Sequence, residues 1–166
     1  MEILVAVSAL AVMGVLLTQV FVTTIRTNTK NEISKEVKQN GDLAVSIMTR
    51  MILNARDVVS DCLSSGSTGS SITITNPDAG TTTFECKSDA GVLRIASTSA
   101  APAYLTGTAV TITGADCANG FIITCTLLPS DRKSVGISFS LAQKGTPPDK
   151  IDQASETYAT TITLRN

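Results

Sequence analysis

The sequence predicts an α+β protein in which one long N-terminal helix packs on an antiparallel β-sheet head. Three observations over its 166 residues indicate this fold class. An uncharged apolar run opens the chain, an apolar stripe at helical spacing follows it, and threonine alternates with β-branched residues in the rest. We therefore divide the chain into a hydrophobic helix over 1–25, its amphipathic continuation over 26–62 and a β-rich globular head over 63–166.

The first segment has the composition of a membrane-spanning helix. No side chain from 3 to 22 is charged, and a helix needs about twenty such residues to cross a bilayer. A soluble domain of this size covers only a stripe of a helix, which disfavours a buried soluble helix. A cleaved secretory signal is disfavoured as well, because the run lacks a basic start and a small-residue cleavage site.

The second segment continues the helix with one apolar face. The stripe contains a row that recurs every seven residues, Val37, Ala44, Met51 and Val58, and an adjacent row, Gly41, Met48, Ala55 and Cys62. Few clean heptads and many small residues favour packing on the protein's own head over an independent coiled coil. No proline precedes Pro77, so we expect the helix to extend to about Asp61.

The third segment reads as short strands separated by turns. We expect strands at 72–75, 81–87, 92–96, 109–113, 121–127, 134–142 and 157–164. The turns at 77–80, 88–91 and 118–120 contain glycine with aspartate or asparagine. Connections this short favour antiparallel pairing. The Gly/Ser-rich stretch 64–71 and the proline-bearing stretch 144–150 are expected to be loops.

Four cysteines lie outside the membrane segment and indicate two disulfides in an oxidising compartment. They lack C-x-x-C spacing, and the sequence has no histidine to complete a zinc site. Of the three connectivities that four cysteines allow, we prefer Cys62 with Cys86 and Cys117 with Cys125. Cys62 ends the sheet-facing row of the helix, next to an early strand, and the second pair closes the turn around Asn119-Gly120.

The composition argues against catalysis and against nucleic-acid binding. Lysine plus arginine number 13 and aspartate plus glutamate 14, so no basic footprint for nucleic acid exists. The absence of histidine removes the commonest general base. Asp78, Asp89 and Asp116 lie in turns without the acidic spacing of a calcium loop, so we expect turn-forming roles. We expect no enzyme activity, no cofactor and no metal.

The sequence leaves the orientation in the membrane open. Arg26 and Lys30 follow the apolar run, and the positive-inside rule alone would place the head in the cytoplasm. The cysteines and the Ser/Thr-rich head favour the other side of the membrane.

The stretch MEILVAVSALAVMG, the amphipathic helix and the β-rich head with its cysteines together resemble the type IV pilin and type II secretion pseudopilin superfamily. Met1-Glu2-Ile3-Leu4-Val5 matches the family pattern around its glutamate. The family's basic leader, the glycine that ends it and the residues before the glutamate are not part of this sequence. Residues 41–52 and 161–166 are similar to larger minor pilins and pseudopilins.

The resemblance implies a pilin-like fold and a structural role. It implies that a prepilin peptidase cleaves the precursor in the cytoplasmic membrane, and that an assembly machine extracts it into a surface filament of copies of itself or other pilins. Glu2 would meet the N-terminal amine of a neighbouring subunit, Ile3, Leu4 and Val5 would pack in the filament core, and Gly14 would let the helix loosen. The alternatives are a secretion pseudopilin and a bitopic membrane protein with an extracytoplasmic binding domain.

Overall fold

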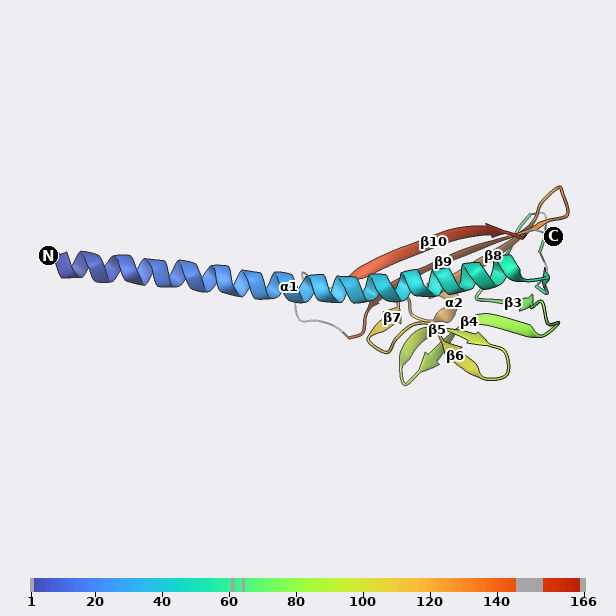
Figure 1. Ribbon diagram of the computed structural model, residues 1–166, viewed down its shortest axis with the longest axis horizontal. Helices are drawn as coiled ribbons and strands as arrows, with labels where there is room; N and C mark the ends of the chain where they lie inside the picture. The colour runs from blue at the N-terminus through green and yellow to red at the C-terminus, as the bar shows by residue number, and fades with distance from the viewer. Residues whose placement is uncertain (1, 61, 64, 146–153, 165–166) are drawn as a thin grey trace.

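The protein is a long helical rod with a β-rich head at one end (Figure 1). The computed structural model describes the whole chain except residues 1, 61, 64, 146–153 and 165–166. Helix α1 (Glu2–Asn54) has 53 residues, which corresponds to roughly 80 Å at about 1.5 Å per residue. Its N-terminal half projects away from the head, and its C-terminal half lies along the head (Figure 1). The predicted α+β class is confirmed.

The strands of the head form two antiparallel sheets. Sheet A contains, in order, β1 (Asp57–Val58), β3 (Ser71–Thr75), β4 (Thr81–Asp89), β5 (Val92–Thr98) and β6 (Pro102–Tyr104). Sheet B contains, in order, β10 (Ser155–Thr163), β9 (Lys133–Gln143), β8 (Phe121–Leu127) and β2 (Ser67–Gly69), and β7 (Val110–Ile112) pairs with the end of β9 beyond β8. A short helix, α2 (Cys117–Gly120), leads into β8.

All seven predicted strands are present, and the sequence missed three short edge strands. Strand β2 lies in the stretch expected to be a flexible loop, where it pairs with β8. Strands β1 and β6 have only two and three residues. Strand β2 is defined by a partner far along the chain, and β1 and β6 are too short for their own alternation to reveal them.

The predicted apolar stripe of α1 is confirmed as the helix side of the core. Six residues of the two predicted rows are buried, as is the nearby Ile52: Val37, Gly41, Ala44, Met48, Ile52, Ala55 and Val58, the last two just beyond the helix. All of them except Gly41 share one hydrophobic cluster with the inner faces of both sheets. The charged side chains of this half of α1, among them Glu36, Lys38 and Arg50, are exposed. The head therefore holds α1 as one of its own core elements.

The helix ends at Asn54, so its expected continuation to about Asp61, which lies outside the described residues, was wrong. The backbone N–H of Arg56 donates to Thr75 O (2.8 Å) and that of Val59 to Thr73 O (2.8 Å). Pairing with β3 thus replaces the helical hydrogen bonds, and the β-branched pair at 58–59 favours the extended form.

The disulfide pairing expected from the sequence was also wrong. The structure joins Cys62 to Cys125, with Cα atoms 4.8 Å apart, and Cys86 to Cys117, with Cα atoms 5.4 Å apart. The chain after β1 runs beside β8, where Leu63 forms a bridge with Thr126, and this places Cys62 against sheet B. Cys117 opens α2, which packs near β4 and therefore meets Cys86. The second bridge ties sheet A to the segment that leads into sheet B.

Candidate functional site: an exposed apolar shaft and its attachment to the head

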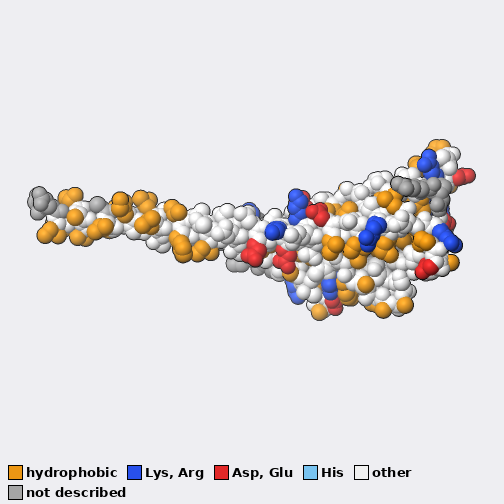
Figure 2. Space-filling model, in the orientation of Figure 1, with side chains coloured by type: hydrophobic (Ala, Val, Ile, Leu, Met, Phe, Trp, Pro, Cys, Tyr) orange, Lys and Arg blue, Asp and Glu red, His pale blue; other side chains and the backbone are white. Residues whose placement is uncertain are grey.

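The N-terminal part of α1 exposes an apolar surface along its whole length. We call residues 3–25 the shaft. Ile3, Leu4 and Val5 are 81%, 75% and 68% exposed, and Phe21 is 67% exposed. On the face drawn in Figure 2, apolar side chains cover this end of the helix and charged ones lie only toward the head. Among the described residues α1 is the one helix long and apolar enough to cross a membrane, and none of its apolar window is buried.

The hydroxyl side chains of the shaft are satisfied within the helix itself. The Ser8 hydroxyl donates to Val5 O (2.8 Å), and the Thr18 hydroxyl donates to Gly14 O (2.8 Å). Further along, Thr23 donates to Gln19 O at 2.8 Å. No hydroxyl of these three therefore needs water, so the shaft is compatible with lipid or with the apolar surface of another helix.

The predicted assembly residues are Glu2, the first residue of α1, and four residues of the shaft, Ile3, Leu4, Val5 and Gly14. A Cβ on Gly14 would meet no atom within 4 Å, so nothing in a single copy requires glycine there. Gly14 lies in a shallow depression of the helix surface together with Ala11, Val15 and Thr18. The side chain of Glu2 lies outside the described residues, so its predicted role stays a prediction.

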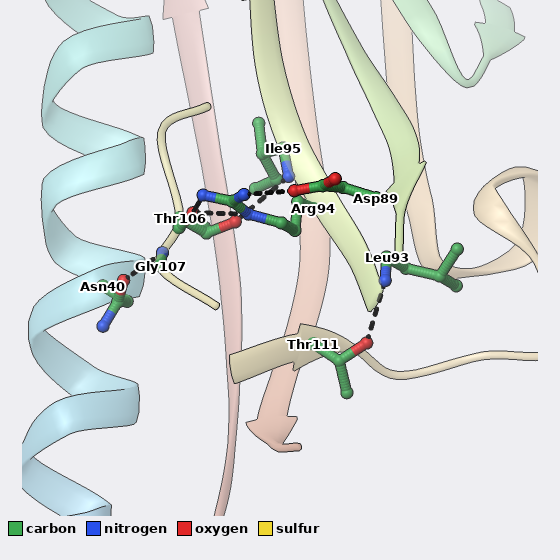
Figure 3. Close-up of polar contacts among 8 residues, drawn as sticks. All are labelled: Asn40, Asp89, Leu93, Arg94, Ile95, Thr106, Gly107 and Thr111. Atoms are coloured by element: carbon green, nitrogen blue, oxygen red, sulfur yellow. Dashed lines mark hydrogen bonds and ion pairs between the residues drawn. The ribbon is translucent and has the colours of Figure 1, made fainter. Parts of the chain in front are cut away.

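A polar cluster attaches the helix to sheet A (Figure 3). The side-chain oxygen of Asn40 accepts a hydrogen bond from Gly107 N (2.7 Å). The neighbouring Thr106 is buried, and its hydroxyl oxygen accepts a hydrogen bond from Ile95 N of β5 (3.2 Å). The loop after β6 is thereby fixed between α1 and sheet A.

Arg94 is the centre of this cluster (Figure 3). Its Nε donates to Thr106 O (2.9 Å), a second guanidinium nitrogen donates to the same oxygen, and Nη1 pairs with Asp89 at 2.6 Å. The guanidinium also lies 4.0 Å from the ring centroid of Tyr104, a cation–π geometry. This cluster was not predicted from the sequence, where Asn40 followed by Gly41 within a helical stretch is a weak local signal of it.

A second attachment lies where the helix ends. Lys133 Nζ contacts Asp57 Oδ1 (2.8 Å) and Val58 O (2.6 Å). The hydrogen bond from Lys133 lowers the pKa of the Asp57 carboxyl, although partial burial acts to raise it. The hydrogen bond from the Val58 N–H and the charge of Lys133 lower this pKa further. The beginning of β9 is therefore tied to β1 beside the end of α1.

The expected turn-forming roles agree with the geometry for Asp78 and Asp116, whereas Asp89 ends strand β4 and forms an ion pair. Asp78 Oδ1 accepts from Gly80 N (3.0 Å), Asp116 caps α2 through Asn119 N (2.9 Å), and Asp89 pairs with Arg94. Within the described ranges, no three His, Cys, Asp or Glu residues are grouped to hold a metal ion. The expected absence of enzyme activity stays a prediction.

Comparison with protein family models, with curated proteins and with solved structures finds no match to this chain. The geometry therefore defines a class only: a membrane-compatible helical shaft fused to a disulfide-bonded β head.

Proposed function

We propose that the protein is a structural subunit of a type IV pilus-like filament, assembled through its shaft. The observation that carries the proposal is the exposed apolar surface of residues 3–25 on a helix whose other half belongs to the core of the head. Such a surface must be covered by lipid or by other apolar helices. In this proposal lipid covers the shaft first, and neighbouring shafts cover it in the filament.

The arrangement suits repeated assembly along an axis. Each head is fixed to its helix by the core and by Asn40, and the pair of Asp57 with Lys133 ties β9 to β1 just after the helix. A contact between different surfaces of identical subunits, repeated without closure, generates a fibre. Shafts would then lie inside and heads outside, on the extracytoplasmic side where disulfides persist.

The proposal includes the partners that the family resemblance implies. These are the cytoplasmic membrane before assembly, a prepilin peptidase, an ATP-driven assembly machine, and copies of this chain or other pilins in the filament. Glu2 would be neutralised by the N-terminal amine of a neighbouring subunit, because an unpaired charge among apolar helices is costly.

The test is to express the chain behind a prepilin leader in cells that carry a type IV assembly machine. We expect filaments in the sheared surface fraction by electron microscopy, with the chain detected in them by antibody. Removal of residues 3–22 is expected to abolish its incorporation. Full-length chain that stays in the membrane fraction without filaments would contradict the proposal and favour a bitopic membrane protein. Incorporation of the truncated chain would contradict it as well.

A further inference from the structure

In the part of the chain that the structure describes, the backbone edge of strand β10 facing away from β9 pairs with no other strand. Within the described residues this strand pairs with β9 alone and ends the strand order of sheet B. The other sheet ends are closed by β1, β2 and β6, which have only two or three residues each. Short edge strands protect a sheet from pairing with another chain. Strand β10 has nine residues and lacks this protection.

The hydrogen bonds to β9 identify which backbone groups face the open edge. Leu164 N donates to Lys133 O (2.9 Å), and Gln143 N donates to Ala154 O (3.1 Å), so even-numbered residues of β10 bond to β9. In an antiparallel ladder the alternate residues direct their N–H and C=O groups to the opposite side. The odd-numbered residues Thr157, Ala159 and Thr161 therefore direct theirs away from β9, and all three are exposed.

The usual protective devices are absent from β10. Its sequence SETYATTIT contains no lysine and no proline, and Glu156 is its only charged residue. It pairs with β9 residue for residue from Ser155 to Thr163, so no bulge bends this edge away. The edge consists of small and β-branched side chains, which favour strand pairing.

We propose that this edge pairs antiparallel with the same edge of a second copy of the chain. In this pairing Ala159 lies opposite Thr161, and Thr157 lies opposite Thr163. These residues direct their free backbone N–H and C=O groups toward each other. The paired threonines lie side by side on the outer face. The single charge, Glu156, then lies opposite Leu164 of the other copy, so no like charges oppose each other. The edge is thus complementary to itself, as a two-fold contact requires.

The geometry also fixes the direction of the two shafts. Strand β10 runs in the same sense as α1, away from the N-terminal end of the rod (Figure 1). Antiparallel pairing of two β10 strands therefore sends the two shafts in opposite directions. The contact can join heads from two facing membranes, so the pairing itself does not depend on the proposed filament. Within the proposed function it would join two filaments of opposite polarity.

The test uses the full chain inserted singly into lipid nanodiscs, which prevents the shafts from associating with each other. We expect sedimentation velocity to detect pairs of discs that form with rising concentration. Ala159→Lys places a charge at the edge and is expected to weaken pairing about tenfold or more. The matched control is Ser138→Lys, which carries the same charge on the same face, on the adjacent strand opposite Ala159.

Amide hydrogen exchange on paired discs supplies an independent readout. We expect pairing to protect the amides of Ala159 and Thr161, while the amide of Thr160, already bonded to β9, changes little. Circular dichroism of both lysine variants checks that the head remains folded. Single discs at every concentration would overturn the proposal. Equal loss of pairing in Ser138→Lys would also overturn it, because the outer face rather than the edge would then be the contact.

Discussion

The phenol ring of Tyr158 lies directly against Gly41 of α1, and no side chain on residue 41 fits between the helix and the ring. The Tyr158 hydroxyl donates to Lys38 O (3.2 Å), and its ring stacks on Phe139 with centroids 5.2 Å apart. This contact determines how closely the helix approaches sheet B. Glycine is required here by close approach, in a helix that otherwise disfavours it.

Gly41→Ala tests this contact. Alanine favours the helix by about 1 kcal/mol over glycine, whereas forcing a methyl group into a packed site costs about 1–3 kcal/mol. We expect the steric cost to win and the free energy of unfolding of the head to fall by about 1 kcal/mol. Denaturant titration measures it. In a Tyr158→Ala background the same substitution should stabilise, and stabilisation by Gly41→Ala alone would contradict the contact.

Tyr158 also predicts a loss of stability at alkaline pH. Burial raises the pKa of its phenol from 10.0 to about 12, and the charges of Asp42 and Glu156 add to the effect. A group whose pKa is higher in the folded state stabilises fully below its unfolded pKa, and that stabilisation disappears as pH rises through the folded pKa. We therefore expect Tyr158→Phe to lose less stability than the parent between about pH 10 and 12. Identical alkaline unfolding curves would contradict this.

The pair of Asp57 with Lys133 predicts the opposite pH dependence. The hydrogen bond from Lys133 holds the pKa of Asp57 below 3.8. The stabilisation is present above that value and is lost as pH falls through the lowered pKa. The carboxylate is largely exposed, so its contribution is about 1 kcal/mol or less. Lys133→Met should raise the pKa of Asp57 in a carboxyl-carbon NMR titration, and an unchanged value would show that Lys133 is not its partner.

The sequence predicted those features that repeat at a fixed spacing. The row from Val37 to Val58 recurs at helical spacing, and the alternation from 134 to 142 identifies β9 and its buried face. The apolar run from 3 to 22 likewise predicts the shaft, because twenty uncharged residues in succession are enough to indicate it. These features are local, so periodicity and composition alone reveal them.

The helix end, the disulfide pairing and the Arg94 cluster, which the sequence missed, depend on contacts between separate segments of the chain. The helix ends where Arg56 meets Thr75, and Cys62 lies beside β8 because the chain turns there toward Thr126. Arg94 reaches Thr106 only because the loop after β6 folds back on β5. None of these pairs shares a spacing in the sequence that would reveal it.

The disulfide pairing is testable by peptide mapping without reduction. Trypsin leaves Cys62 and Cys86 in the peptide 57–87, and it leaves Cys117 and Cys125 in the peptide 95–132. The observed bridges cross between these peptides: Cys62–Cys125 and Cys86–Cys117. We therefore expect one joined species, which separates into two after reduction. Two separate peptides, each bridged internally, would instead restore the pairing first expected from the sequence.

A second digest identifies the partners within the joined species. Chymotrypsin cleaves after Phe84, Tyr104 and Phe121, which separates the four cysteines onto different peptides. We expect the peptide that ends at Phe84 to remain attached to the one that follows Phe121. Attachment to the peptide that ends at Phe121 would indicate the third connectivity and contradict the structure.

Gly14→Leu tests whether the shaft packs against other shafts. In a single copy a Cβ at this position meets no atom within 4 Å, and the shaft lies away from the head, so leucine should leave the head and the membrane insertion unchanged. Small residues let neighbouring helices approach closely, and a larger side chain would hold them apart. We expect less of the variant in sheared filaments relative to the membrane fraction, measured by immunoblot. The control is Val12→Leu, a small enlargement at another exposed position of the same shaft. An unchanged ratio for Gly14→Leu would remove Gly14 from the assembly surface, even where filaments still form.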